Sequence, residues 1–87
     1  EVLTAATDSV TLINDINTNG KKSTYVGGSA EADTEMEQSD INDVVQRNVD
    51  HLEIILEYTD PDVKGSSDDK SSYTGAITTG KAYIAAN

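Results

Sequence analysis

TEMEQSDINDVVQRNVDHLEIILEY, the stretch from Thr34 to Tyr58, decides the fold because it is the longest periodic segment of the chain. On a helix that turns about 100° per residue, its apolar side chains fall on a single face. The resulting stripe consists of Ile41, Val45, Asn48, Leu52 and Ile55, with Val44, Val49 and Leu56 beside it. An apolar face of this width predicts a central helix that packs against two other helices.

Both ends of this helix carry signals in the sequence. Thr34 and Glu37 have the spacing of a capping box, in which the two side chains bond backbone N–H groups at a helix start. Ser39 offers a second possible start. Because a proline disfavours helical geometry in the residue before it, Pro61 predicts that the helix ends near Tyr58.

Asn48 is a polar residue inside the apolar stripe. Single polar residues in helical cores fix the register of packing by bonding a neighbouring helix. We therefore expect the Asn48 amide to be buried and to bond another helix.

The opposite, acidic face of the central helix carries side chains suited to contact with a protein. They are Met36, Arg47, Ile54 and Tyr58. Single exposed apolar residues are ordinary, but a group of this kind favours a partner surface. We interpret these four as partner contacts, together with two residues of the preceding connection, Tyr25 and Val26.

The N-terminal segment is a shorter amphipathic stretch. One helical face of it carries Val2 or Leu3, Ala6, Val10 and Ile13. This spacing predicts a first helix at about 2–18. The alternative is a strand hairpin near residues 10–26, because Asn19-Gly20 is a strong hairpin signal.

The C-terminal segment predicts a third helix at about 72–86. One side of it carries Tyr73, Ile77, Gly80 and Ile84, with Ala76 and Tyr83 flanking them. A glycine inside a helix costs about 1 kcal/mol relative to alanine. Gly80 on the inner side therefore predicts a close approach to the central helix.

Together these segments predict one small helical domain over residues 1–87. The expected class is mostly α, a small antiparallel three-helix arrangement around a long central helix. The alternative is an α+β fold with a hairpin near residues 10–26. The chain is 36% hydrophobic and has no Phe or Trp, so its core is small, and domains of this size often depend on a partner.

The charge balance narrows the classes of partner. Sixteen acidic residues against six basic ones give a net charge of −10. This disfavours nucleic acids and anionic membranes, which require cationic side chains. It fits a basic protein partner or a mimic of DNA charge. No apolar run reaches membrane-spanning length, and without cysteine there is neither a disulfide nor a thiolate metal site.

A calcium loop is suggested by part of one connection. Asp15, Asn17, Asn19 and Gly20 match positions 1, 3, 5 and 6 of an EF-hand loop. Lys22 and Val26, however, stand where an apolar residue and a bidentate glutamate are expected. The competing interpretation, which we favour, is a helix C-terminus at Asn19-Gly20.

No motif in the sequence specifies a reaction. His51 is the one histidine, and no nucleophile or orienting carboxylate accompanies it. We expect no catalytic residue, metal, cofactor or small-molecule substrate. Acyl carrier proteins are also small, acidic and helical, and they carry a prosthetic group on a serine in an Asp-Ser-Leu motif. The nearest match here is Gln38-Ser39-Asp40-Ile41, in which the order of Ser and Asp is reversed.

Three stretches of the second half resemble small virion structural proteins of tailed bacteriophages. They are QRNVDHLEIIL (46–56), the Asp-rich connection 59–71 and AITTGKAYIAAN (76–87). The resemblance lies in layout and carries over no functional residues. It implies a subunit of a virion that contacts other copies or other virion proteins.

We therefore expect a non-enzymatic structural or assembly protein, located in a virion or otherwise soluble in an undetermined compartment. One alternative is an acidic inhibitor or DNA mimic that binds a basic enzyme. The other is a carrier-type acidic helical domain modified at Ser39.

Overall fold

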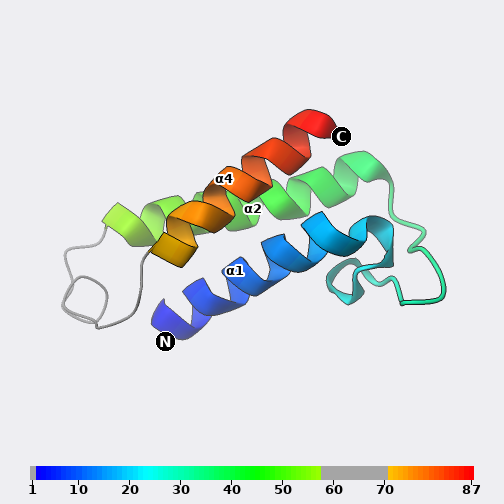
Figure 1. The fold of residues 1–87 in the computed structure, drawn as a ribbon, viewed down its shortest axis with the longest axis horizontal. Helices are drawn as coiled ribbons and strands as arrows, with labels where there is room; N and C mark the ends of the chain where they lie inside the picture. Colours follow the sequence, from blue (N-terminus) through cyan, green and yellow to red (C-terminus); the bar gives the residue numbers. More distant parts are fainter. Residues whose placement is uncertain (1, 58–70) are drawn as a thin grey trace.

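Three helices run alternately up and down along the long axis of the molecule (Figure 1). The computed structural model describes residues 2–57 and 71–87, and it gives the burial of side chains from Ala6 onward. The helices are α1 (Val2–Asn19), α2 (Gln38–Glu57) and α4 (Ser71–Ala86). Two short 3₁₀ turns, η1 (Gly20–Lys22) and η2 (Thr24–Val26), follow α1. Each helix contacts the other two, and the molecule measures 41 × 23 × 16 Å. The mostly α, three-helix prediction is confirmed.

Helix α1 packs through a face with alternating spacings of three and four residues. Its buried members are Ala6, Ser9, Ile13 and Ile16. Val10 and Leu12 lie at the margin of this face and are half-buried. Gly20, at a φ of +56°, ends the helix in the left-handed conformation that glycine adopts without strain. The alternative hairpin near residues 10–26 is therefore wrong: residues 10–19 are helical, and the described residues contain no strand.

Helix α2 begins at Gln38, three residues later than the capping pattern predicts. The carbonyl of Glu37 accepts the first helical bond, from the N–H of Ile41 at 3.1 Å. Thr34 Oγ1 instead accepts from the N–H of Met36, two residues on, at 3.3 Å. Thr34 therefore closes a local turn before the helix, and the predicted capping box is wrong.

The inner face of α2 makes the largest contribution to the core. Its buried residues are Ile41, Val45, Val49, Leu52 and Ile55. Because the face is wide, α2 packs against α1 and α4 at the same time. The predicted two-sided packing is confirmed, with Val49 at its centre and Asn48 half-buried at its edge.

Helix α4 approaches the other two helices most closely at Gly80. A Cβ built there would lie 2.5 Å from Val49 Cγ2 and 3.2 Å from Val45 Cγ1. The predicted close approach at Gly80 is thus confirmed. The buried face of α4 is turned slightly from the predicted one: Tyr73, Ala76, Gly80 and Tyr83 are buried, whereas Ile77 and Ile84 are half-buried.

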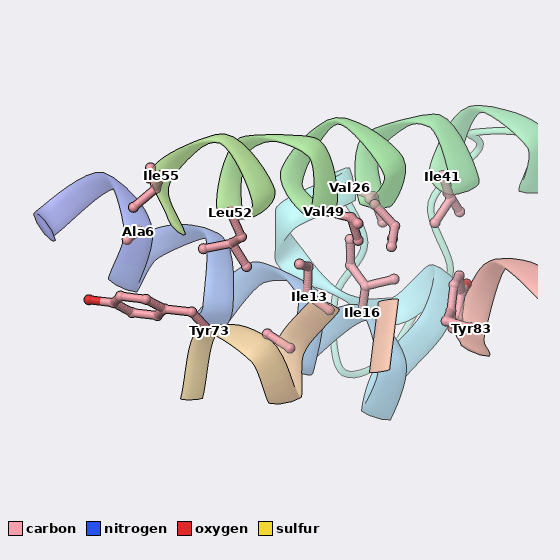
Figure 2. Packing of buried hydrophobic residues seen from close by; sticks show 12 residues of the cluster. Ala6, Ile13, Ile16, Val26, Ile41, Val49, Leu52, Ile55, Tyr73 and Tyr83 are labelled. Carbon is pink, nitrogen blue, oxygen red and sulfur yellow. The ribbon is translucent and has the colours of Figure 1, made fainter. Parts of the chain in front are cut away.

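The core is a single row of aliphatic side chains with a tyrosine at each end (Figure 2). Tyr73 lies at the end formed by Ala6 and Ile55, and Tyr83 lies beside Ile41. Gln38 Nε2 donates to the hydroxyl of Tyr83 at 2.8 Å and so ties the start of α2 to α4. Both aromatic rings thus cover the ends of a core that contains neither Phe nor Trp.

One polar contact crosses the interface between α1 and α2. Ser9 Oγ donates to Asn48 Oδ1 at 2.9 Å, and Asn48 Nδ2 donates to the carbonyl of Val44 at 2.8 Å. Ser9 is buried, so this hydrogen bond matches a polar group of one helix to a single position on the other. The prediction that Asn48 bonds a neighbouring helix is confirmed, but the prediction that it is buried is wrong, because Asn48 lies half-buried at the edge of the interface.

Candidate interaction surfaces

The side of α2 that faces away from α1 and α4 forms the first surface, which we name the outer face. Its residues are Asp43, Arg47, Asp50 and Ile54, all of them exposed. Their spacings of four, three and four residues place them on one side of the helix. Ile54 is 53% exposed, and the other residues of the face are charged.

The charges of the outer face make no ion pair with the residues that the structure describes. Asp50 Oδ1 accepts from Gln46 Nε2 at 2.8 Å. In residues 2–57 and 71–87, the one ion pair joins Lys81 and Glu53 at 3.2 Å, between α4 and α2. Arg47 therefore has no carboxylate partner in that part of the chain and is free to contact another molecule.

Two residues predicted for this surface are not found on it. Met36 precedes the start of α2, is half-buried and packs against the core. The structure therefore does not place it with Ile54 on the outer face, and its role as a partner contact stays a prediction. Tyr58 lies outside the described residues.

The connection from α1 to α2 forms the second candidate region, and its structure centres on Ser23. This residue is only 1% exposed. Its hydroxyl donates to the Asp15 carboxylate and accepts from the N–H of Tyr25. Its carbonyl accepts from the N–H groups of Val26, at 3.2 Å, and Gly28, at 2.9 Å. One buried serine thus fixes both the end of α1 and the turn that follows.

Glycines and a backbone bond complete this connection, which we name the folded loop (residues 20–34). Gly27 has a φ of +84°, which strains any residue with a side chain. A Cβ on Gly28 would lie 2.1 Å from the carbonyl oxygen of Lys21, so only glycine fits there. The N–H of Thr34 donates to the same oxygen at 2.8 Å and closes the loop. Loops that pack on themselves in this way are frequently functional.

Tyr25 and Val26 are adjacent in the folded loop but differ in solvent exposure. Val26 is 4% exposed and packs in the core beside α2 (Figure 2). Its prediction as a partner contact is wrong, because the 3₁₀ turn directs it inward. Tyr25 is 45% exposed. Beside it, Lys22 is exposed and Lys21 is half-buried, and neither makes an ion pair with the described residues. We name Lys21, Lys22 and Tyr25 the basic tip.

The contact between Asp15 and Ser23 is the structural feature of this region that sequence patterns did not identify. Serine hydroxyls often bond backbone N–H groups two residues on, which is a local signal for the Ser23–Tyr25 turn. The contact with Asp15, eight residues earlier, has no local signal. A small pocket of about 250 Å³ lies where the loop meets α1, lined by Asp15, Asn19, Lys22, Thr24 and Ala30.

The calcium interpretation does not agree with this geometry. Asp15, Asn17 and Asn19 lie on α1, where alternate residues point in different directions. The Asp15 carboxylate already accepts from Asn19 Nδ2, at 2.9 Å, and from Ser23. In the part of the chain that the structure describes, no group of three or more acidic or histidine side chains could hold a metal ion.

Two further residues that the sequence offers as candidates for chemistry, His51 and Ser39, lie on the surface. His51 is exposed on α2. Ser39, the candidate attachment point of a carrier, is exposed at the second position of α2. The carrier interpretation stays a prediction, because an exposed serine at a helix start is common.

Comparison with known proteins yields no relative: no family model, no curated protein and no solved structure matches this chain. Among the described helices, none is both long and apolar enough to cross a bilayer.

Proposed function

We propose that this chain is a non-enzymatic assembly domain that acts through protein–protein contacts, with the outer face of α2 as its contact surface. The observation that carries the proposal is the exposure of Ile54, at 53%, on the one side of α2 that the other helices leave free. Its charged neighbours Arg47 and Asp50 give the surface a polar surround.

This arrangement has the character of an interaction hot spot. Such sites combine a central anchor residue with a surround that excludes water once the partner is in place. The inner face of α2 already fills the core with five buried aliphatic residues. Ile54 is not among the residues packed in or against that core, and a contact with another molecule would bury its exposed half.

The decisive experiment measures the native mass of the chain purified from its source, with the co-purifying proteins identified. Ile54→Asp is expected to abolish the complex, because it puts a charge at the centre of the contact. Ala82→Asp is the matched control, an exposed apolar-to-aspartate change on α4. Retention of the full complex by Ile54→Asp would overturn the proposal.

The finer proposal is that the assembly is a tailed-phage virion, which rests on the resemblance of the second half of the chain to small virion proteins. Density-gradient purification of particles tests it. The chain should remain with the particles in constant proportion to the major capsid protein, and removal of the chain by washing in moderate salt would argue against a virion subunit.

A second candidate, an acidic inhibitor that binds a basic enzyme, is favoured by the carboxylates along α2. Asp40, Asp43, Asp50 and Glu57 are exposed, and the net charge is −10. Binding that depends on these charges weakens steeply as salt rises. Affinity for the captured partner that is unchanged between low and high salt would exclude this candidate in favour of the assembly domain.

A further inference from the structure

We infer that the outer face of α2 is occupied by the basic tip of a second copy of this chain, so that the copies associate head to tail. The inference rests on the proposed function and names the partner of the same surface. It draws on the positions and the chemistry of the two surfaces and on the rigidity of the basic tip.

The basic tip and Ile54, the apolar residue of the outer face, lie toward opposite ends of α2. The basic tip belongs to the folded loop, which joins the end of α1 to the start of α2 (Figure 1). Ile54 lies 16 residues beyond Gln38, which is about 24 Å along the helix. Within one chain the basic tip is therefore too far from Ile54 to cover it. A contact between the two requires a second copy.

The chemistry of the two surfaces is complementary. Among the described residues, the large hydrophobic side chains that are exposed are Tyr25 and Ile54, one on each surface. Lys22, three residues before Tyr25, has no ion-pair partner in those residues, and Asp50 lies one helical turn before Ile54. Arg47, on the same face, offers the Tyr25 ring a cation–π contact. The resulting interface would pair Tyr25 of one copy with Ile54 of the other, and side chains of opposite charge would lie around this apolar contact.

The basic tip is rigid before it binds. Ser23 holds the Tyr25 N–H, Gly27 takes the left-handed turn, and Gly28 packs directly on the Lys21 backbone. A surface that is fixed in advance loses little conformational freedom on association. The net charge of −10 opposes self-association, but at physiological salt repulsion reaches only about 8 Å.

The contact is heterologous, because different surfaces of the two copies meet. A heterologous contact closes into a ring if the rotation between copies permits, and otherwise extends into a filament. The inference therefore predicts species larger than dimers, unlike a symmetric contact of two outer faces.

Two variants, each lacking one surface, test the inference in sedimentation velocity at physiological salt. The tip variant is Lys22→Glu/Tyr25→Ala, and the face variant is Ile54→Asp. All three positions are exposed, and circular dichroism verifies that each variant keeps its helices. The wild-type chain should form concentration-dependent species beyond the dimer. Each variant alone should associate at least about tenfold more weakly, the size of a hot-spot loss.

Mixing the two variants is the decisive measurement. The tip variant retains an intact face and the face variant an intact tip, so an equimolar mixture should form 1:1 dimers and nothing larger. Ala82→Asp is the control and should associate like the wild type. A wild-type chain that stays monomeric, a tip variant that associates normally, or a mixture that stays monomeric would each overturn the inference. A monomeric chain whose native complex is still lost in Ile54→Asp would leave the proposed function standing with a different partner.

Discussion

Gly75 and Gly80 lie five positions apart on α4 but differ in packing: Gly80 is tightly packed, and Gly75 has open space around it. A Cβ on Gly80 would collide with Val49 and press on Val45 and Ile13. A Cβ on Gly75 would have no heavy atom within 4 Å. The intrinsic preference of helices for alanine over glycine is the same at both sites. The difference in stability between Gly80→Ala and Gly75→Ala therefore isolates the effect of packing.

Gly80→Ala should lower the free energy of unfolding by about 1–3 kcal/mol, the usual cost of overpacking, despite the gain in helix propensity. Gly75→Ala, the matched control, should raise it by roughly 0.5–1 kcal/mol. Urea denaturation of the two variants measures both values. Equal effects of the same sign would show that α4 does not approach Val49 as described.

The pair formed by Ser9 and Asn48 places a hydrogen bond in an otherwise apolar interface. Ser9→Ala leaves the Asn48 carbonyl oxygen without its donor, so we expect a loss of about 1 kcal/mol, at the low end for a buried group because Asn48 is only half-buried. Ser9→Ala/Asn48→Leu removes both partners and should recover most of this loss. A double-mutant cycle by urea denaturation measures the coupling, and strictly additive effects would contradict the contact.

At the scale of the elements, the folded loop explains why α2 begins where it does. The N–H of Thr34 donates to the Lys21 carbonyl, across thirteen residues of chain, and Thr34 therefore belongs to the loop. The local pattern from Thr34 to Glu37 fits a capping box equally well. The loop forms instead of the capping box because it pairs two backbone groups that are distant in sequence, the Thr34 N–H and the Lys21 carbonyl.

Gly28→Ala should disrupt the folded loop while the three helices persist. The added Cβ would meet the Lys21 carbonyl at 2.1 Å, so the backbone must move and the bond to Thr34 must lengthen or break. Amide hydrogen exchange should show lost protection at Gly28 and Thr34, with protection in α2 and α4 retained. Ala30→Ser, an exposed change in the same loop, is the control and should leave exchange unchanged. Unchanged protection in Gly28→Ala would contradict the loop geometry.

Periodicity in the sequence was sufficient to predict the three helices, the bond made by Asn48 and the close approach at Gly80. These features depend on which residues share a helical face, and that is a local property. The loop was not predictable, because Ser23 and Asp15 meet only after α1 has ended. For the same reason Val26 and Tyr25, adjacent in sequence, could not be assigned to the core and the surface in advance. The outer face stays a prediction, carried by Ile54 and Arg47.

For the whole molecule, the net charge of −10 opposes folding through mutual repulsion. Sixteen acidic residues share a chain of 87 residues, and the described ion pair, Lys81–Glu53, is solvent-exposed. Exposed pairs of this kind contribute about 0–1 kcal/mol. Mutual repulsion of the acidic residues should therefore dominate the electrostatics of the folded state.

The melting temperature should rise with sodium chloride at neutral pH. Screening shortens the range of repulsion from about 30 Å at 0.01 M to about 8 Å at 0.15 M. Differential scanning calorimetry across this range measures the effect. Lys81→Gln should melt close to the wild type at every salt concentration, since it removes only an exposed pair. A melting temperature that falls with salt would show that attractive charge pairs, not repulsion, govern stability.

The up–down–up order of the helices also has a mechanical consequence. α1 begins at one end of the long axis, and α4 finishes at the other (Figure 1). A pull applied to these two helix ends is directed along the helix axes. It would load the contacts of α1 and α4 with α2 in shear, all turns together, rather than peel them apart one turn at a time. The packed row of side chains from Ala6 to Tyr83 would then resist extension as a unit.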